Sequence, residues 1–200
     1  MICVNELLIK EINSKVTLKI MNGITYITGQ NGTGKTFFLD YLCKIRKYPV
    51  NAITGNNNVI YMRQNFSFYN RLKVKEFINF IYDLCGEDKN NFYFFLEQNA
   101  FPFKIEKLKN TKLGMLSGGE RRAIYILAIF SLKREWYVLD EPFAFLDKEM
   151  KNIIIDIMRK LKKDNKNIIF TNHEYYDYME EMVDHIIDFE KVKVPLSRFT

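Results

Sequence analysis

The sequence predicts an α/β fold with a mainly parallel sheet, short antiparallel strands near the N-terminus and a helical subdomain. Apolar strand patterns at 136–139 and 167–171 alternate with helical patterns, which is typical of strands that pair in parallel. A glycine-rich loop at 29–36 lies between a strand pattern and a helical pattern. Residues 65–114 show helical but no strand periodicity. We therefore expect a sheet core that a helical insert interrupts.

The glycine-rich loop has the spacing of a nucleotide phosphate-binding loop, G-x-x-x-x-G-K-[ST]. A strand pattern at 24–28 precedes it and an apolar helical face follows it, which is the context that the motif requires. Its glycines let successive N–H groups point toward phosphate oxygens, Lys35 can reach the β- and γ-phosphates, and the Thr36 hydroxyl can bind Mg²⁺. The expected nucleotide-binding residues are those of the loop and the one after it: Gly29, Gln30, Asn31, Gly32, Thr33, Gly34, Lys35, Thr36 and Phe37. A glycine-rich turn with a surface lysine is the alternative.

Composition narrows the class of protein. The chain has 200 residues and a net charge of +6, and its basic residues are interleaved with acidic ones, so we expect no nucleic-acid partner. No apolar run approaches the ~20 residues that span a bilayer, and the N-terminus lacks the pattern of a signal peptide. Three cysteines without metal-ligand spacing are typical of free thiols in a reducing cytoplasm.

The remaining elements follow from periodicity and from turn residues. In the N-terminal part we expect strands at 2–10 and 15–20, a turn at 22–23, a helix that follows the phosphate-binding loop and ends near Lys47, and a strand at 59–62. In the C-terminal part we expect helices after Ser117 and after Asp147, a short helix at about 175–183 and a last strand from His185 to Phe189. Within the insert, one apolar helical stripe comprises Val74, Phe77, Ile78, Ile81 and Tyr82, and a dense aromatic cluster follows at 92–103.

Polar residues follow several of the predicted strands. Asp140 and Glu141 end the strand at 136–139, at the edge where open α/β sheets bind ligands. Gln64 follows the strand at 59–62, and His173 follows the strand at 167–171. Each has a simpler alternative when taken alone: the acidic pair as a helix cap, the histidine as a structural residue, and the glutamine as a polar residue after a strand.

Taken together, these motifs resemble those of the ATP-binding subunits of ABC (ATP-binding cassette) proteins, in order and spacing, over essentially the whole chain. The loop resembles Walker A, and Gln64 resembles the glutamine of the Q-loop. The sequence LSGGE at 116–120 is similar to the ABC signature, and 137–141 is similar to Walker B with the glutamate that follows it. AFLD at 144–147 resembles the D-loop, and His173 resembles the switch histidine.

The resemblance implies a P-loop NTPase fold and an ATPase. It implies a single nucleotide-binding domain over 1–200, with a RecA-like core at 1–64 and 115–200 and a helical ABC subdomain at 65–114. The implied catalytic residues are Glu141, which polarises the attacking water, His173, Gln64 and Lys35. The implied Mg²⁺ site comprises Thr36, Gln64 and Asp140.

The signature has a separate implied role. In the family, two subunits pack head to tail and each signature contacts the nucleotide held by the other subunit. This implies a homodimer or heterodimer in which Ser117, Gly118, Gly119, Glu120 and the D-loop Asp147 are nucleotide-contacting residues. The cofactors implied are ATP and Mg²⁺.

The sequence also departs from the family pattern. Members usually carry an aromatic residue that stacks on adenine some 25 residues before the loop lysine, whereas residues 7–12 contain none, so an aliphatic contact is expected in its place. The hairpin at 10–16 is short, and Glu190-Lys191 replaces a glycine turn.

Among ABC proteins, the resemblance favours the ATPase of a membrane transporter, exporter-like, that binds an integral-membrane permease on the cytoplasmic face of the membrane. The stretch 70–77 is similar to exporter ATPases, and export of a peptide or a drug-like molecule is the favoured activity. Phe66, Phe68, Tyr69 and the aromatics at 92–103 would line a groove for the permease, although filling the subdomain core is the alternative for most of them. The rival classes are a soluble ABC ATPase of iron–sulfur assembly or DNA maintenance, and a cassette that does not hydrolyse ATP.

Overall fold

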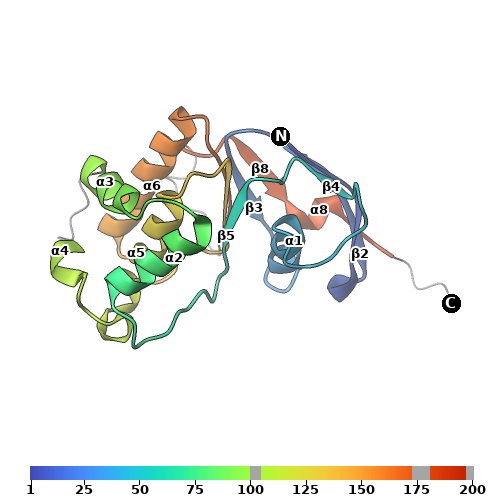
Figure 1. Cartoon of the computed structure of the whole chain (residues 1–200). Helices are drawn as coiled ribbons and strands as arrows, with labels where there is room; N and C mark the ends of the chain where they lie inside the picture. The colour runs from blue at the N-terminus through green and yellow to red at the C-terminus, as the bar shows by residue number, and fades with distance from the viewer. Residues whose placement is uncertain (100–104, 173–180, 197–200) are drawn as a thin grey trace. The chain divides into compact units, whose positions relative to one another are not determined.

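A computed structural model describes residues 1–99, 105–172 and 181–196 (Figure 1). The chain forms two compact units. The first comprises 1–64, 134–142 and the chain from 158 onward. The second comprises 65–133 and 143–157, so it groups the helix after Ser117 with the insert. His173, and the part of the helix expected over 175–183 that precedes residue 181, lie outside the described residues.

The first unit contains a five-stranded parallel sheet, which confirms the predicted fold class. Its strands, in spatial order, are β5 (Val59–Met62), β6 (Trp136–Leu139), β7 (Asn167–Thr171), β3 (Ile24–Thr28) and β8 (His185–Asp188). Each neighbouring pair is parallel. Every residue of β6 and β7 is buried, as expected for central strands that are covered on both faces.

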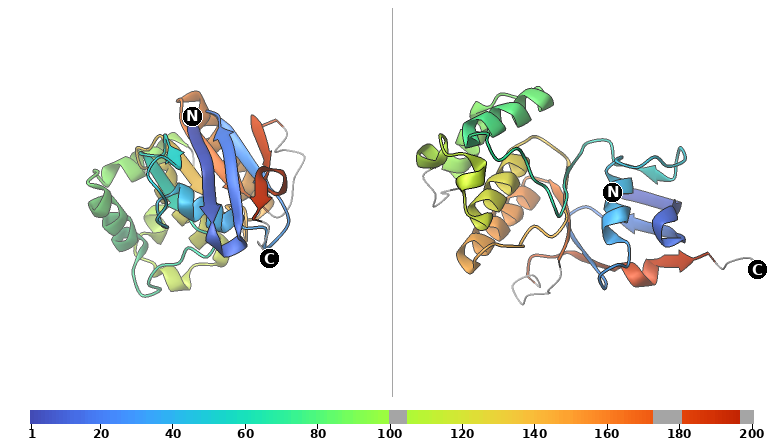
Figure 2. Two further views of the ribbon diagram at one scale, coloured as in Figure 1. Left: turned by 90° about the vertical axis from the view of Figure 1, so that its right-hand side faces the viewer. Right: turned by 90° about the horizontal axis from the view of Figure 1, so that it is seen from below.

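A second sheet, antiparallel, contains both of the expected N-terminal strands. Its order is β4 (Ile53–Thr54), β1 (Ile2–Ile9), β2 (Ser14–Ile20) and β9 (Lys193–Pro195). The left view of Figure 2 shows β1 and β2 side by side, in blue. A 3₁₀ turn, η1 (Lys10–Ile12), and Asn13 in the left-handed conformation connect them. The sequence did not predict β4 or β9, because two or three residues are too few to show a strand period.

The helix after the phosphate-binding loop, α1 (Lys35–Leu42), ends earlier than the expected Lys47. Lys44 adopts a left-handed conformation with φ of 60°. The Lys44 N–H donates to Tyr41 O and the Ile45 N–H donates to Asp40 O, which is the Schellman pattern that terminates helices. Ile45 therefore lies outside the helix and is 60% exposed.

The last strand of the parallel sheet ends at Asp188, one residue before the expected end. The Asp188 side chain accepts a hydrogen bond from the Glu190 N–H and caps a short helix, α8 (Phe189–Val192). Phe189 is fully buried and belongs to a core cluster that joins residues of both sheets, such as Leu7 and Val138, to Phe38 of α1. This cluster fixes the strands and the helix that flank the phosphate-binding loop.

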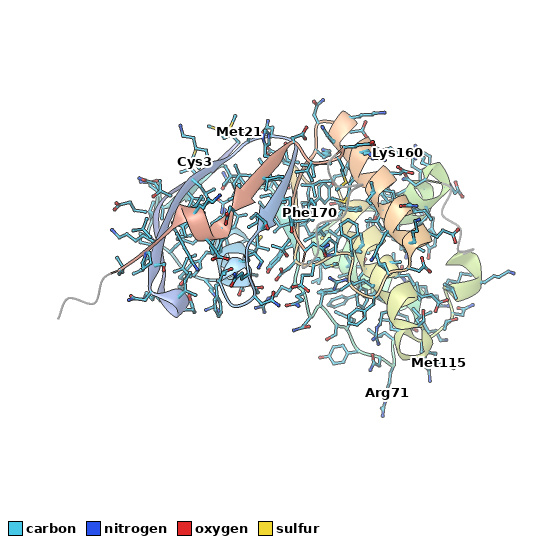
Figure 3. All side chains as sticks on the ribbon, turned by 180° about the vertical axis from the view of Figure 1, so that it is seen from behind. Cys3, Met21, Arg71, Met115, Lys160 and Phe170 are labelled. Atoms are coloured by element: carbon cyan, nitrogen blue, oxygen red, sulfur yellow. The ribbon has the colours of Figure 1, made fainter. Side chains whose placement is uncertain are left out.

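The second unit is helical among its described residues. Its elements are α2 (Val74–Cys85), α3 (Asn90–Gln98), α4 (Ile105–Leu108), the 3₁₀ turn η2 (Leu113–Met115) and α5 (Gly118–Phe130), and α6 (Lys148–Lys163) begins in it. Four of the five residues of the predicted stripe on α2 are buried, and Ile81 is half-buried. Arg71 and Met115 lie at the same end of this unit (Figure 3), where the Gly114 N–H donates to Asn70 O.

The entry to β3 depends on a turn at Gly23 that packs against Asp184 in the first unit. Gly23 has φ of 113°, and a Cβ there would lie 2.5 Å from an Asp184 carboxylate oxygen. Asp184 accepts a hydrogen bond from the Ile24 N–H at 2.9 Å and pairs with Lys162 at 2.5 Å. Burial alone would raise the pKa of Asp184, but these hydrogen bonds and the charge of Lys162 lower it below its ordinary value.

We predict that Asp184→Asn destabilises the protein in a pH-dependent way. The pKa of Asp184 is lower in the folded state than in the unfolded state. The carboxylate therefore stabilises the folded state at pH values above the unfolded-state pKa, and this stabilisation is lost as the pH falls through the folded-state pKa. The variant should lose about 1 kcal/mol of unfolding free energy at pH 7, a difference that shrinks below about pH 4. Urea titrations at several pH values measure it, with the exposed Asp164→Asn as control. A deficit that does not change with pH would contradict this assignment.

Candidate functional site

The phosphate-binding loop connects β3 to α1 and has the backbone that its glycines allow. Gly29, Gly32 and Gly34 all have positive φ, at 140°, 77° and 103°. Gly34 is the N-cap of α1, and a Cβ there would lie 2.7 Å from Ile12 Cδ1. Substitution of Gly34 would therefore strain the backbone and clash with Ile12. An aliphatic side chain from the 10–16 region thus packs on the loop, in the part of the chain where the sequence lacks an aromatic residue.

Lys35 lies at the start of α1 with its ammonium group held within the loop. Its Nζ donates to the carbonyl oxygens of Gly29 at 2.5 Å and Gln30 at 2.9 Å. Burial lowers the pKa of Lys35 below its ordinary value, although the carboxylates of Asp140, Glu141 and Glu190 oppose the shift. A partly desolvated ammonium group close to exposed loop amides is suited to binding phosphate oxygens.

Glu190 on α8 is a residue that sequence reasoning missed at this site. Its Oε1 accepts a hydrogen bond from the Gln30 N–H at 2.9 Å. The sequence had shown Glu190 only as a departure from a glycine turn. Its contact could not have been found from local patterns, since the two residues are 160 positions apart.

Asp140 is held in one geometry by hydroxyl groups from two other elements. One carboxylate oxygen accepts from Thr36 Oγ1 of α1 at 2.8 Å, and the other accepts from Thr171 Oγ1 at the end of β7 at 2.5 Å. Asp140 is 2% exposed. A hydroxyl and a carboxylate in contact are the hard oxygen ligands that Mg²⁺ prefers, so Thr36 and Asp140 fit a Mg²⁺ site. The described residues contain no group of three or more His, Cys, Asp or Glu side chains that could hold a metal.

Glu141 is held beside this pair in a strained conformation. Its φ is 53°, and a residue other than glycine pays about 1–2 kcal/mol for the left-handed region. Its N–H donates to Thr171 Oγ1 at 3.0 Å, and its carboxylate accepts from Gln64 Nε2 at 2.7 Å. Glu141 is only 8% exposed. Strain of this kind persists where the surroundings over-determine it, as at functional sites.

Thr171 is the second residue that the sequence did not single out. Its hydroxyl contacts both acidic residues, because it donates to Asp140 and accepts from the Glu141 N–H. It is fully buried. A polar residue at the end of an apolar strand was the available signal, and it is a weak one.

The signature lies in the second unit, at the start of α5. Ser117 Oγ accepts from the Glu120 N–H at 3.1 Å, and the Glu120 side chain accepts from the Ser117 N–H at 2.8 Å, which forms a capping box. Gly119 needs its small size, since a Cβ would lie 3.0 Å from Phe145 O. Asp147 accepts from the Met150 N–H at 2.8 Å at the start of α6.

The predicted site residues thus fall into two groups. The first unit brings together the phosphate-binding loop, Gln64, Asp140 and Glu141. The second unit brings the signature next to the D-loop, where Gly118 and Gly119 approach Phe145. His173 lies outside the described residues. Among the described helices, none is long and apolar enough to cross a membrane.

Comparison with known proteins shows the family of the chain. The sequence matches the family described as ABC transporter over residues 14–144. The chain therefore belongs to the ABC transporter family and is one of its ATP-binding, P-loop ATPase domains, for which ATP hydrolysis is the expected activity.

Curated relatives have low sequence identity to this chain but match most of its length. An uncharacterised ABC transporter ATP-binding protein of Methanocaldococcus jannaschii is 25% identical over 92% of this chain and 70% of that protein. An energy-coupling factor transporter ATP-binding protein of Ligilactobacillus salivarius is 28% identical over 90% and 69%. A cytochrome c biogenesis ATP-binding export protein of Reclinomonas americana is 25% identical over 84% and 79%.

Solved structures share the fold. The structure of an ATP-binding subunit of an ABC transporter superposes with a TM-score of 0.81 at 19% identity, over 98% of this chain and 90% of that one. A dimeric bacterial ABC transporter cassette superposes with a TM-score of 0.75 at 17% identity, over the full length of both chains.

We predict that Thr171→Val lowers the kcat for ATP hydrolysis about tenfold, as loss of an orienting partner commonly does. Valine has nearly the same shape but no hydroxyl, so the Asp140 carboxylate loses this donor and the Glu141 backbone N–H loses this acceptor. Steady-state ATPase assays measure the effect. Thr171→Ser keeps the hydroxyl and should retain most of the activity. Equal kcat values for the valine variant and the wild type would show that the hydroxyl does not orient these groups.

Proposed function

We propose that this chain hydrolyses ATP with Mg²⁺ to power transport through a separate permease, with export of a peptide or drug-like molecule as the favoured activity. The observation that carries the hydrolytic part is the pair of hydrogen bonds Thr36–Asp140 and Gln64–Glu141 beside the phosphate-binding loop. One relative is named as an export protein, which supports the direction. The proposed location is the cytoplasmic face of the membrane.

In this proposal each residue of the first unit has one task. The loop amides of 29–37 and the Lys35 ammonium group bind the phosphates of ATP. Thr36 and Asp140 hold Mg²⁺, with Gln64 near it, and the ion supplies charge neutralisation on the phosphates. Glu141 orients the attacking water, and its hydrogen bond from Gln64 fixes the carboxylate. His173 is proposed to contact the γ-phosphate.

The second unit is proposed to act on a nucleotide held by another subunit. Ser117, Gly118, Gly119, Glu120 and Asp147 would contact ATP bound by a second ABC subunit, identical or different, in a head-to-tail dimer. The helix start of α5 offers backbone N–H groups for that anion. Phe145, 84% exposed beside the signature glycines, would lie in the same interface.

We predict that Glu141→Gln binds ATP but loses at least about 100-fold in kcat and accumulates as an ATP-bound dimer. The amide keeps the shape and the hydrogen-bonding reach of the carboxylate but cannot polarise water as a general base. ATPase assays and size-exclusion chromatography with and without ATP and Mg²⁺ measure the two effects.

Lys35→Ala is the matched control for this experiment. It should lose nucleotide binding and remain a monomer under the same conditions, because the phosphates lose their cation. Turnover of Glu141→Gln at the wild-type rate would refute the role given to Glu141. A monomeric Glu141→Gln with bound ATP would refute the dimer.

A surface of the second unit supports the permease part of the proposal. Tyr69, Phe80 and Leu84 are 77%, 43% and 70% exposed, and Phe68 packs against Tyr69 and Phe80 with ring centroids 5.6 and 5.1 Å apart. Phe92 is fully buried, as the core-filling alternative requires, whereas Phe94 is 60% exposed. We propose that the surface formed by Phe68, Tyr69, Phe80 and Leu84, the aromatic surface, docks an apolar segment of the permease.

Affinity capture of tagged Glu141→Gln from its native cells, with ATP, Mg²⁺ and mild detergent, tests this partner. We expect an integral-membrane protein to be captured, and we expect Tyr69→Ser combined with Leu84→Ser to lose it without loss of ATP hydrolysis. Lys75→Ser on α2, the helix that carries Leu84, serves as a control that keeps the partner. Capture of only proteins without membrane spans would favour the class of ABC ATPases that work without a permease.

A further inference from the structure

Asp40 is a buried carboxylate for which the proposed chemistry has no use. It lies on α1, one turn after Thr36, and its side chain is 1% exposed. Its Oδ2 atom pairs with Arg46 Nε at 3.2 Å and with Arg63 Nη2 at 3.0 Å. No described residue forms a hydrogen bond with its other oxygen, Oδ1. A buried carboxylate is costly unless it is paired, so the two arginines determine whether Asp40 is tolerated.

Two groups near Asp40, the Tyr61 hydroxyl and the Cys43 thiol, contribute no charge of their own. Burial, and then the charges of Asp140 and Asp40, raise the pKa of the Tyr61 hydroxyl, and burial with the same two carboxylates raises the pKa of the Cys43 thiol. Both groups are therefore neutral at physiological pH. The negative charge of Asp40 is compensated by the guanidinium groups of Arg46 and Arg63, so both ion pairs are strong.

The two arginines have different surroundings. Arg46 lies in the segment after α1, beyond the left-handed Lys44, and its guanidinium group stacks over the Phe37 ring at 4.9 Å and pairs with Glu11. Arg63 follows β5 directly and comes immediately before Gln64. Its side chain is 52% exposed, so its ordered position depends on the pair with Asp40.

The segment 62–64 is thus held at three consecutive residues. The Met62 carbonyl accepts from the Asp140 N–H at 2.8 Å, Arg63 is held by Asp40, and Gln64 Nε2 donates to Glu141 at 2.7 Å. Fixing residue 63 on α1 limits the directions that the next side chain can take. The helix that carries Thr36 therefore also sets the position of the amide that contacts Glu141.

We propose that Asp40 and Arg63 are positioning residues for ATP hydrolysis, which present Gln64 to Glu141 from the helix that carries the phosphate-binding lysine. This inference rests on the proposed function, because it requires Gln64 to act in the reaction. Neither residue of the pair is assigned a contact with the nucleotide. Loss of the pair should lower kcat and leave the KM for ATP almost unchanged.

The test is a double-mutant cycle on kcat. Arg63→Gln should lower kcat about tenfold in the wild-type background, as loss of a partner that orients an active-site group does. Gln64→Ala should lower kcat at least as much. In the Gln64→Ala background, Arg63→Gln should change kcat by less than about twofold, because its effect passes through the missing amide.

Two further variants separate positioning from stability. Arg46→Gln removes the other guanidinium group from the same Asp40 oxygen and should cost similar thermal stability while keeping kcat within about twofold of the wild type. Arg63→Lys keeps a cation within reach of Asp40 and should recover most of the activity. It also gives a measurement if Arg63→Gln does not fold.

Each contrary result has a distinct meaning. Independent, multiplying effects of Arg63→Gln and Gln64→Ala would overturn the positioning role, as would an unchanged kcat for Arg63→Gln. An equal loss of kcat in Arg46→Gln would show a general loss of stability and would overturn it too. An unchanged kcat for Gln64→Ala, together with an inactive Glu141→Gln, would refute the role of Gln64 and this inference while leaving the proposed hydrolysis in place.

Discussion

The buried residue Asp140 forms hydrogen bonds with three elements of the first unit, two through its carboxylate and one through its backbone N–H. Its two oxygens accept from hydroxyl groups on α1 and β7, and its N–H donates to the end of β5. A carboxylate in the interior needs partners of this kind, because water is not available to solvate it. One partner, Thr36, is the last residue of the phosphate-binding loop, and another, Met62, lies two residues before Gln64. The same hydrogen bonds therefore stabilise the edge of the sheet and fix the geometry of the site.

Thr171 and Asp40, which belong to none of the motifs, also orient residues of the site. Thr171 serves both acidic residues at once, and Asp40 ties α1 to the residue before Gln64. Orienting groups of this kind tune a site without touching the substrate. Glu141 shows why they are needed, since its left-handed backbone would relax without the Thr171 hydroxyl and the Gln64 amide to hold it.

Most of the fold and the site could be predicted because they depend on local patterns. Strand and helix periods located the parallel sheet, and fixed spacings located the phosphate-binding loop and the acidic pair. Errors arose where the decisive interaction was not local. The end of α1 depends on one left-handed residue, Lys44, that has no periodic signature. The strand β9 depends on its pairing with the edge of β2, which is distant in sequence. Glu190 and Thr171 act through contacts with distant residues that no spacing reveals.

The pairing of β9 with β2 has a consequence for how the protein is made. Ser14 pairs with Pro195, and the Asn13 side chain donates to the Leu196 carbonyl, 183 residues away in sequence. Glu190, between these strands in the chain, accepts a hydrogen bond from the Gln30 N–H of the phosphate-binding loop. During synthesis the loop emerges before Glu190 and β9, so it cannot form this hydrogen bond until those residues have been made. Until then the edge of β2 that β9 covers is unpaired.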